Sequence, residues 1–375
     1  MHLTVERPAL AAALKLATTA AGKIGAASIS LRATPGRLTV AAQGWDRAID
    51  ATIPADVHTA GTVAVPGHLI AEWAASDRAA EIEVSTNEAL AKLRGSRELS
   101  VKTLPDALEE SLHPADGPSA TLPREEFVDV LRRLAGCVSD DPFLPKFQAV
   151  ELAFGGGRLV ASATNRYVVG RVILAIDGHD EFTVTPPHAA LLAATSGLEG
   201  DEITLTADGG TLWLSDADQA THVRLSTLED PAWVRLDHIL AVEESHTLTT
   251  ILTSADLRRE VVSVTKLDRL AGARTPQIHL TAQENVGLWV ESDQGKDELA
   301  GLSTGAVLAY EGDEIDGILN PAYLLAALDV VKAETVRVRH RLPVGVSQLK
   351  PLSLTDPAAS PRLVAQACVM PIRKP

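Results

Sequence analysis

Three short segments of the chain carry apolar residues at positions i, i+4 and i+7. The residues are Leu10, Leu14 and Ala17; Phe127, Leu131 and Leu134; and Leu257, Val261 and Val264. This spacing places the apolar side chains on one face of an α-helix. Each segment follows a plausible helix start, namely ERP at 6–8, LPREE at 122–126 and TSAD at 253–256. The pattern therefore predicts three amphipathic helices, each beginning a new stretch of the chain.

A second phrase also occurs three times, as VPGHLIAEWAAS at 65–76, PPHAALLAATSG at 186–197 and NPAYLLAALDVV at 320–331. Strand-like runs precede it each time: GRLTVAAQ at 36–43, GRLVASAT at 157–164 and GLWVESD at 287–293. Chance similarity between Leu/Ala helices is the alternative for any one pair. Three markers in the same order favour a true repeat of helix, strands, helix and strands.

The polar stretches near 112–119 and 241–248 separate the copies. We therefore predict domains at 1–117, 118–245 and 246–375. A chain of 375 residues is also too long for one ordinary hydrophobic core, which agrees with a division into three.

Composition narrows the class of protein. No run of apolar residues approaches a membrane span, and MHLTVERPAL lacks a signal-peptide pattern, so we expect a cytoplasmic protein without membrane contact. The two cysteines lie far apart and predict neither a disulfide framework nor a zinc site. The net charge of -15 argues against simple nucleic-acid binding, which normally needs a basic footprint.

An enzyme is the natural rival class. The chain has no phosphate-binding GxxxxGK[ST] loop, no HExxH or HxxxH spacing and no GxSxG motif. GGG at 155–157 reads as a hairpin turn, and DGHDE at 177–181 reads as a solvated loop rather than a metal or acid–base cluster. We expect no catalysis, no metal and no cofactor.

Five motifs resemble the bacterial sliding clamp, the beta subunit of the replicative DNA polymerase. They are LTVERPALAAAL at 3–14, ATNRYVVGR at 163–171, STLEDPAWVRL at 226–236, GILNPAYLLAAL at 317–328 and CVMPIRKP at 368–375. The resemblance covers nearly the whole chain. It implies an α+β fold of three tandem clamp domains, each with two helices packed on antiparallel sheets, and a head-to-tail homodimeric ring. It also implies a non-catalytic processivity factor in DNA replication.

Such a ring would encircle double-stranded DNA without reading its sequence. The six predicted helices together carry almost no net charge, so the excess of acidic residues lies elsewhere in the chain. The helices would therefore not repel the phosphate backbone. The alternative is that their basic residues are solvated and form ion pairs within a helix, as Asp129 and Arg133 would. The candidate DNA-facing residues are Lys15, Lys23, Arg132, Arg133, Arg258, Arg259 and Lys266.

Partners of the family insert a short peptide into a groove between the second and third domains. The resemblance implies that the replicative polymerase, the clamp loader and other proteins with a clamp-binding motif bind there. The alternative for Tyr323 and Met370 is packing in a core. The implied groove residues are Thr164, Arg166, Tyr167, Val169, Pro231, Arg235, Leu236, Asn320, Tyr323, Val344, Val346, Met370, Pro371, Ile372 and Arg373.

The chain departs from the family pattern in several places. Val168 replaces a common basic residue, Asp230 replaces an aromatic residue before Pro231, and GKIGAAS at 22–28 replaces the usual Pro-Leu segment. These departures fit a diverged clamp copy of actinobacterial type, with altered peptide or inhibitor sensitivity. A second alternative is a clamp-shaped scaffold that binds partners but loads little on DNA.

Overall fold

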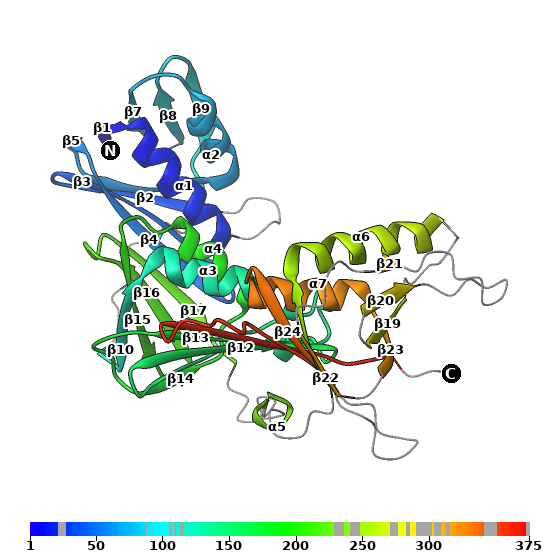
Figure 1. Ribbon diagram of the computed structural model, residues 1–375. Helices are drawn as coiled ribbons and strands as arrows, with labels where there is room; N and C mark the ends of the chain where they lie inside the picture. The colour runs from blue at the N-terminus through cyan, green and yellow to red at the C-terminus, as the bar shows by residue number, and fades with distance from the viewer. Residues whose placement is uncertain are drawn as a thin grey trace. The chain divides into compact units, whose positions relative to one another are not determined.

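The computed structural model describes residues 1–21, 28–87, 89–105, 107–108, 110, 112, 116–228, 236–240, 248–270, 277–282, 286–289, 302–303, 309–312, 315–340 and 351–372. The chain forms two compact units (Figure 1). Unit 1 consists of Met1–Val128 and Asp177–Glu229, and unit 2 consists of Asp129–Ile176 and Asp230–Pro375.

The same order of elements occurs three times along the chain, as the sequence predicts: a strand, a helix, several strands, a second helix and three strands. The first copy is β1 (His2–Glu6), α1 (Arg7–Ala21), β2 (Ser28–Thr34), β3 (Arg37–Gln43), β4 (Arg47–Pro54), β5 (Asp56–Thr59), β6 (Gly61–Pro66), α2 (Gly67–Ser76), β7 (Glu81–Thr86), β8 (Leu90–Arg94) and β9 (Glu98–Lys102).

The second copy is β10 (Ser119–Pro123), α3 (Arg124–Leu134) with the 3₁₀ turns η1 (Ala135–Cys137) and η2 (Pro145–Phe147), β11 (Glu151–Gly155), β12 (Arg158–Thr164), β13 (Val168–Ala175), β14 (Phe182–Val184), α4 (His188–Gly197), β15 (Glu202–Asp208), β16 (Thr211–Asp216) and β17 (Thr221–Ser226). The third copy follows the short helix α5 (Asp237–Leu240). It is β18 (Leu248–Thr253), α6 (Ser254–Leu270), β19 (Ile278–Ala282), β20 (Val286–Trp289), β21 (Leu302–Ser303), β22 (Ala309–Gly312), β23 (Ile315–Leu319), α7 (Pro321–Val331), β24 (Thr335–His340), β25 (Leu352–Thr355) and β26 (Leu363–Val369).

The apolar stripes predicted for the helices are buried. All nine of the stripe residues, from Leu10 in α1 to Val264 in α6, are at most 2% exposed. In unit 1, α1 packs on α2 and on strands β3 and β4, and in unit 2, α6 lies beside α7 (Figure 1). Burial of one helical face thus fixes each helix to its sheet or partner helix, as the periodicity predicts.

Strand pairing joins the first and second copies into one sheet in unit 1. Its order is β10-β15-β16-β17-β4-β3-β2-β6, and β4 pairs with β17 in antiparallel register from Arg47 with Leu225 to Ala51 with Thr221. The five-stranded sheet β5-β1-β7-β8-β9 also belongs to unit 1. Unit 1 therefore crosses the predicted boundary at 117/118, and the domain limits stay a prediction.

Unit 2 is joined in the same way. Its main sheet has the order β11-β12-β13-β26-β25-β24-β18-β22, with β13 and β26 antiparallel from Val168 with Val369 to Leu174 with Leu363. A four-stranded sheet has the order β21-β20-β19-β23. The strand pair β13–β26 brings the C-terminal segment next to the second copy.

Two glycines permit close packing in unit 2. A Cβ atom on Gly170, in β13, would lie 2.8 Å from Cys137 Sγ, 2.8 Å from Val330 Cγ2 and 2.9 Å from Leu134 Cδ2. A Cβ atom on Gly136, in η1, would lie 2.6 Å from the Cβ atom of a residue of α7. The absence of side chains at these positions lets η1, α7 and β13 approach one another.

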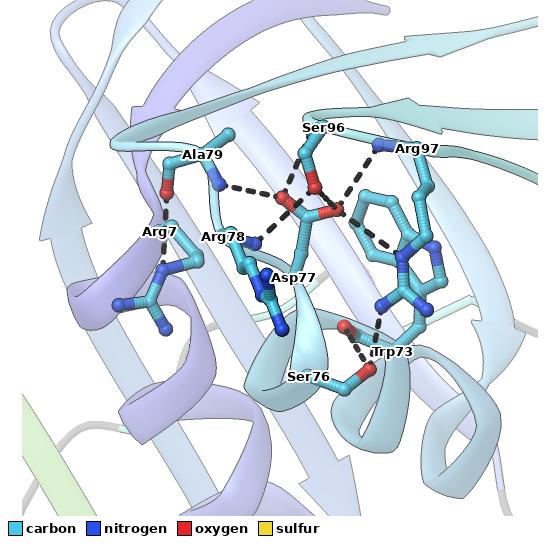
Figure 2. Close-up of polar contacts among 8 residues, drawn as sticks. All are labelled: Arg7, Trp73, Ser76, Asp77, Arg78, Ala79, Ser96 and Arg97. Atoms are coloured by element: carbon cyan, nitrogen blue, oxygen red, sulfur yellow. Dashed lines mark hydrogen bonds and ion pairs between the residues drawn. The ribbon is translucent and has the colours of Figure 1, made fainter.

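A buried carboxylate fixes the end of α2 to the β8–β9 turn in unit 1 (Figure 2). Asp77 Oδ1 accepts hydrogen bonds from the backbone N–H groups of Ala79 and Ser96 at 2.8 and 3.0 Å. Oδ2 accepts one from the N–H of Arg97 at 3.2 Å and one from the Ser96 hydroxyl at 2.8 Å. These bonds, led by that from Ala79, hold the pKa of Asp77 well below its usual value.

Replacing Asp77 by asparagine is expected to lower the melting temperature by roughly 5 °C at pH 7, because one acceptor oxygen becomes an NH₂ group facing N–H donors. Since the folded pKa of Asp77 is lower than its ordinary value of 3.8, its ionised form stabilises the fold above that value. This contribution is lost as the pH falls through the lowered pKa. The difference between wild type and Asp77→Asn should therefore narrow below pH 4 in calorimetric scans.

Asp208→Asn is the matched control, because Asp208 lies in the same unit on an exposed strand end. Its melting temperature should equal that of the wild type at every pH. An Asp77→Asn protein that melts like this control at pH 7 would show that the buried carboxylate is dispensable.

Candidate functional site

A three-residue turn joins β12 to β13 and is held by side-chain hydrogen bonds. The side-chain oxygen of Asn165 accepts from the backbone N–H groups of Tyr167 and Val168 at 3.0 and 2.9 Å. The Thr164 hydroxyl donates to the carbonyl of Val168 at 2.9 Å and accepts from the N–H of Arg166 at 3.1 Å. Arg166 is left-handed, with φ of 83°. The turn thus holds the exposed side chains of Arg166 and Tyr167 on a defined backbone.

The first turn of α7 lies against this β12–β13 turn. Asn320 caps the helix, since its side chain accepts from the N–H of Ala322 at 2.9 Å, and Pro321 occupies the first helical position. The cap places Tyr323 so that its ring stacks on that of Tyr167, with centroids 5.2 Å apart and planes at 5°. Burial, with the neighbouring Tyr167, raises the pKa of Tyr323.

The segment after β26 completes the arrangement. The N–H of Met370 donates to the carbonyl of Tyr167 at 2.8 Å, and the N–H of Ile372 donates to the carbonyl of Ile318 at 2.8 Å. Met370, Pro371 and Ile372 are each only partly buried. They therefore run from the β12–β13 turn to the strand that leads into α7, with side chains partly open to solvent.

An apolar cluster lies beside this segment. Val169, Leu236, Leu240 and Cys368 are buried together, with Ile239 packed against them. The short helix α5 is attached by further polar contacts, including a hydrogen bond from the Gln366 side chain to the carbonyl of Leu240 at 2.8 Å and an ion pair between Arg171 and Asp237 at 2.8 Å. Leu236 is therefore buried against Val169 of β13 and Cys368 of β26.

Most of the predicted groove residues that are described lie in these three neighbouring elements. Tyr323 and Met370 are partly exposed, so neither is an ordinary core residue. The groove residues described are Thr164, Arg166, Tyr167, Val169, Leu236, Asn320, Tyr323, Met370, Pro371 and Ile372. Pro231, Arg235, Val344, Val346 and Arg373 lie outside the described residues.

Sequence reasoning missed two residues of the η2 turn. The Arg166 guanidinium lies over the ring of Phe147, 5.8 Å from its centroid, and the Lys146 ammonium lies over the same ring at 5.4 Å. The only signal was the short run PKF at 145–147, which has no periodicity to mark it. Packing of the 139–148 loop beside the β12–β13 turn creates this contact.

The two backbone hydrogen bonds made by Met370 and Ile372 form a frame for this site, and an equivalent backbone frame occurs in unit 1. The N–H of Ser226, the last residue of β17, donates to the carbonyl of Asp46 in the β3–β4 turn at 2.8 Å. The N–H of Leu228 donates to the carbonyl of Thr185 at 3.0 Å. These bonds match, position for position in the repeat, the two bonds made by the segment after β26. The frame alone is therefore a property of the repeat.

The side chains on the two frames differ. Asp46 and Ala190 take the places of Tyr167 and Tyr323, and Ala190 is buried. Within the described parts of the chain, the stacked ring pair thus occurs only in unit 2. Side chains that are present on one copy of a repeated frame are candidates for function rather than for folding.

The predicted DNA-facing residues are only partly free. Lys15 of α1, Arg132 of α3 and Lys266 of α6 are exposed and form no ion pair with another described residue. Arg269, in the last turn of α6, is likewise exposed and was not predicted. Lys23 lies outside the described residues.

Arg133 forms contacts that join α3 to the end of α7. Its Nε donates to Asp129 at 2.7 Å, and its Nη1 donates to the carbonyls of Val330 and Val331 at 3.2 and 3.0 Å. Lys332 also binds Asp129, at 2.6 Å. Only 12% of the Arg133 side chain is exposed. Arg133 therefore satisfies carbonyls at the end of α7, and a role for it toward DNA stays a prediction.

Two further arginines are paired as well. Arg258 binds Asp329 of α7, and Arg259 binds Asp256 at 2.8 Å and Glu260 at 3.3 Å. The hydrogen bonds that Arg259 donates to the carboxylates of Glu260 and Asp256 raise the pKa of Arg259. The alternative of ion pairs within helices is thus present in both α3 and α6, and the role of Arg258 and Arg259 toward DNA stays a prediction.

Comparison with known proteins defines the fold. No family model matches the chain. It is 24% identical over 322 residues to the beta sliding clamp of Streptomyces coelicolor, covering 83% of this chain and 82% of the relative. It is 24% identical over 271 residues to the beta sliding clamp of Lactococcus lactis, covering 69% and 67%.

Solved structures agree over the whole length. The beta subunit of DNA polymerase from Streptococcus pyogenes superposes with a TM-score of 0.86 at 16% identity, covering 100% of both chains. The sliding clamp of Bacillus subtilis gives 0.85 at 17% identity, covering 100% of this chain and 99% of that one. The chain therefore has the α+β fold of the bacterial sliding clamps, built from three repeats. The resemblance seen in its motifs is confirmed.

Among the described residues, no helix is long and apolar enough to cross a membrane. No group of three or more His, Cys, Asp or Glu side chains among them could hold a metal ion.

Proposed function

We propose that this protein is a DNA sliding clamp, a non-catalytic processivity factor that encircles duplex DNA as a homodimer in the cytoplasm. It tethers the replicative polymerase, the clamp loader and other partners. The observation that carries the proposal is the sliding-clamp fold over the entire chain, with TM-scores of 0.86 and 0.85. Encirclement depends on shape rather than on reactive groups, so a threefold repeat without a catalytic motif suits it.

The charges support weak, sequence-independent contact with DNA. The chain has a net charge of -15, yet exposed cations lie on the first helices of the three copies, at Lys15, Arg132 and Lys266. Few contacts to phosphate give low affinity, and low affinity permits sliding. The topological link, rather than binding energy, then retains the protein.

The groove supplies the second half of the function. Tyr167, Tyr323 and Met370 expose apolar surface between the β12–β13 turn and α7, beside the buried cluster around Val169. Hydrogen-bonding groups of the turn and the C-terminal segment can fix an extended peptide there, while rings and the flexible methionine receive its apolar side chains. A short linear motif of a partner fits such a site.

A second candidate is a diverged clamp copy that acts mainly as a scaffold and loads little on DNA. The pairing of Arg133, Arg258 and Arg259 with carboxylates favours it, because these cations are not free for phosphate. The two candidates differ in retention on DNA and share the groove.

Loading by a clamp loader and ATP onto nicked circular DNA is the test. We expect the dimer to stay on the circle through gel filtration and to leave after the circle is cut, since only topology retains it. Replacing Arg132, Lys266 and Arg269 by glutamate should lower the amount of protein loaded per circle at least about tenfold, because each charge reversal repels the phosphate backbone as the DNA enters.

Reversal of Arg37, Arg94 and Arg158, which are exposed on strands, supplies the matched control and should leave the amount of protein loaded unchanged. Equal retention on linear and circular DNA would contradict encirclement. A strict monomer in native mass spectrometry would contradict the ring, and failure of the wild type to load would favour the scaffold.

A further inference from the structure

Arg166 occupies an unusual position at the rim of the groove. Its side chain is exposed, and its backbone has a φ of 83°, which side-chain-bearing residues rarely adopt. The guanidinium carbon lies 5.8 Å from the centroid of the Phe147 ring and 5.4 Å from that of the Tyr167 ring. Tyr167 in turn stacks on Tyr323. The cation is thus held among aromatic faces on a hydrogen-bonded turn.

No carboxylate of the described chain forms an ion pair with Arg166. This differs from many of the arginines that the structure describes, which do lie against a carboxylate. These paired arginines are Arg32, Arg47, Arg97, Arg124, Arg133, Arg171, Arg258 and Arg259. In a chain with 49 acidic residues, an arginine held by rings in place of a carboxylate keeps its N–H fork available.

We propose that Arg166 binds an acidic side chain of the partner peptide, so that the groove selects peptides with a carboxylate next to their apolar residues. This inference rests on the proposed peptide-binding function. Contact with ring faces orients a guanidinium and leaves the N–H groups at its edge free for a bidentate carboxylate. Because the turn already restricts the Arg166 backbone, little freedom is lost on binding.

The position of Arg166 favours a peptide over a DNA phosphate. Its turn contacts Tyr323 at the start of α7, whereas Arg133 binds Val330 and Val331 at the end of α7. Tyr323 and Val330 are seven residues apart in this helix, which separates them by about 10 Å along its axis. Arg132, which is exposed and forms no ion pair with another described residue, is next to Arg133 in the sequence. It therefore lies nearer the C-terminal end of α7 than Arg166 does.

Fluorescence anisotropy with the full-length protein tests the proposal. The probes are a fluorescein-labelled tail peptide of the replicative polymerase, with an aspartate beside its apolar residues, and the same peptide with asparagine in that place. We expect wild type to bind the acidic peptide at least about tenfold more tightly than the neutral one. The Arg166→Glu variant should lose this preference. A third peptide, with lysine in place of the aspartate, should bind the Arg166→Glu variant more tightly than the acidic peptide does.

Two variants separate the side chain from the backbone. Arg166→Gly relieves the left-handed strain, so it should melt at or above the wild-type temperature and still lose the preference for the acidic peptide. Arg158→Glu makes the same charge change at the other end of β12 and should keep the preference.

Each other outcome counts against the inference. Equal binding of acidic and neutral peptides by wild type overturns it and leaves the groove intact. Loss of retention on circular DNA by Arg166→Glu, with the peptide preference unchanged, assigns the residue to phosphate instead. If wild type binds neither peptide, the proposed groove fails together with the inference.

Discussion

Replacing Tyr167 and Tyr323 together by alanine is expected to weaken binding of the polymerase-tail peptide about 100-fold. The two rings form a stacked pair between the β12–β13 turn and the start of α7, and both have exposed surface. Aromatic side chains in such positions supply most of the apolar contact area of a small site. Isothermal titration or anisotropy at fixed salt measures the loss.

The control for this double variant removes an aromatic side chain elsewhere. Trp45 is fully exposed on the β3–β4 turn of unit 1, so its alanine variant should bind the peptide like wild type. Phenylalanine at 167 and 323 keeps the stacked rings and should retain most of the affinity. Unchanged binding by the double alanine variant would remove the rings from the site.

Gly170→Val is expected to destabilise unit 2 by roughly 3 kcal/mol or more, the upper range for overpacking a core. Its Cβ alone would approach Cys137, Leu134 and Val330 to less than 3 Å, and the two added methyl groups would crowd them further. Since β13 follows the β12–β13 turn and pairs with β26, peptide binding should fall together with stability. Urea unfolding followed by circular dichroism gives the change in free energy.

Ala175→Val makes a comparable addition at an exposed position of the same strand. It should leave the free energy of unfolding within about 0.5 kcal/mol of the wild-type value. A Gly170→Val protein as stable as this control would mean that η1 and α7 can move away from β13 at little cost.

The repeat and the helices could be predicted from the sequence because their signals are local. Leu10, Phe127 and Leu257 each begin an apolar stripe with helical spacing, and every stripe proved buried. The recurrence of Leu-Leu-Ala-Ala at 191 and 324 likewise marked α4 and α7. The spacing of apolar residues predicts which face of a helix is buried, and this prediction needs no knowledge of distant parts of the chain.

The free or paired state of a charge could not be predicted in the same way. Arg133 looked like a helix cation near Asp129, yet its main additional partners are carbonyls of Val330 and Val331, nearly 200 positions away in sequence. The contact of Phe147 with Arg166 was missed for a related reason, because it joins a loop to a hairpin turn. Such contacts depend on packing between elements, which spacing along the chain does not encode.

The compact units were also beyond sequence reasoning. Pro- and Gly-bearing stretches predict where the chain is polar, and the domain limits drawn from them stay a prediction. These stretches do not show that β4 pairs with β17, or β13 with β26, so that the largest sheet of each unit draws strands from two successive copies. Register between distant strands follows from shape and burial in three dimensions.

The hydrogen-bonded strand pairs between successive copies have a mechanical consequence. To bend the chain at such a joint, β4 would have to separate from β17, or β13 from β26, and several backbone hydrogen bonds would break at once. Joints of this kind are stiff. In a closed assembly of two such chains, a motor that admits DNA would do less work by opening a contact between the chains than by breaking one of these joints.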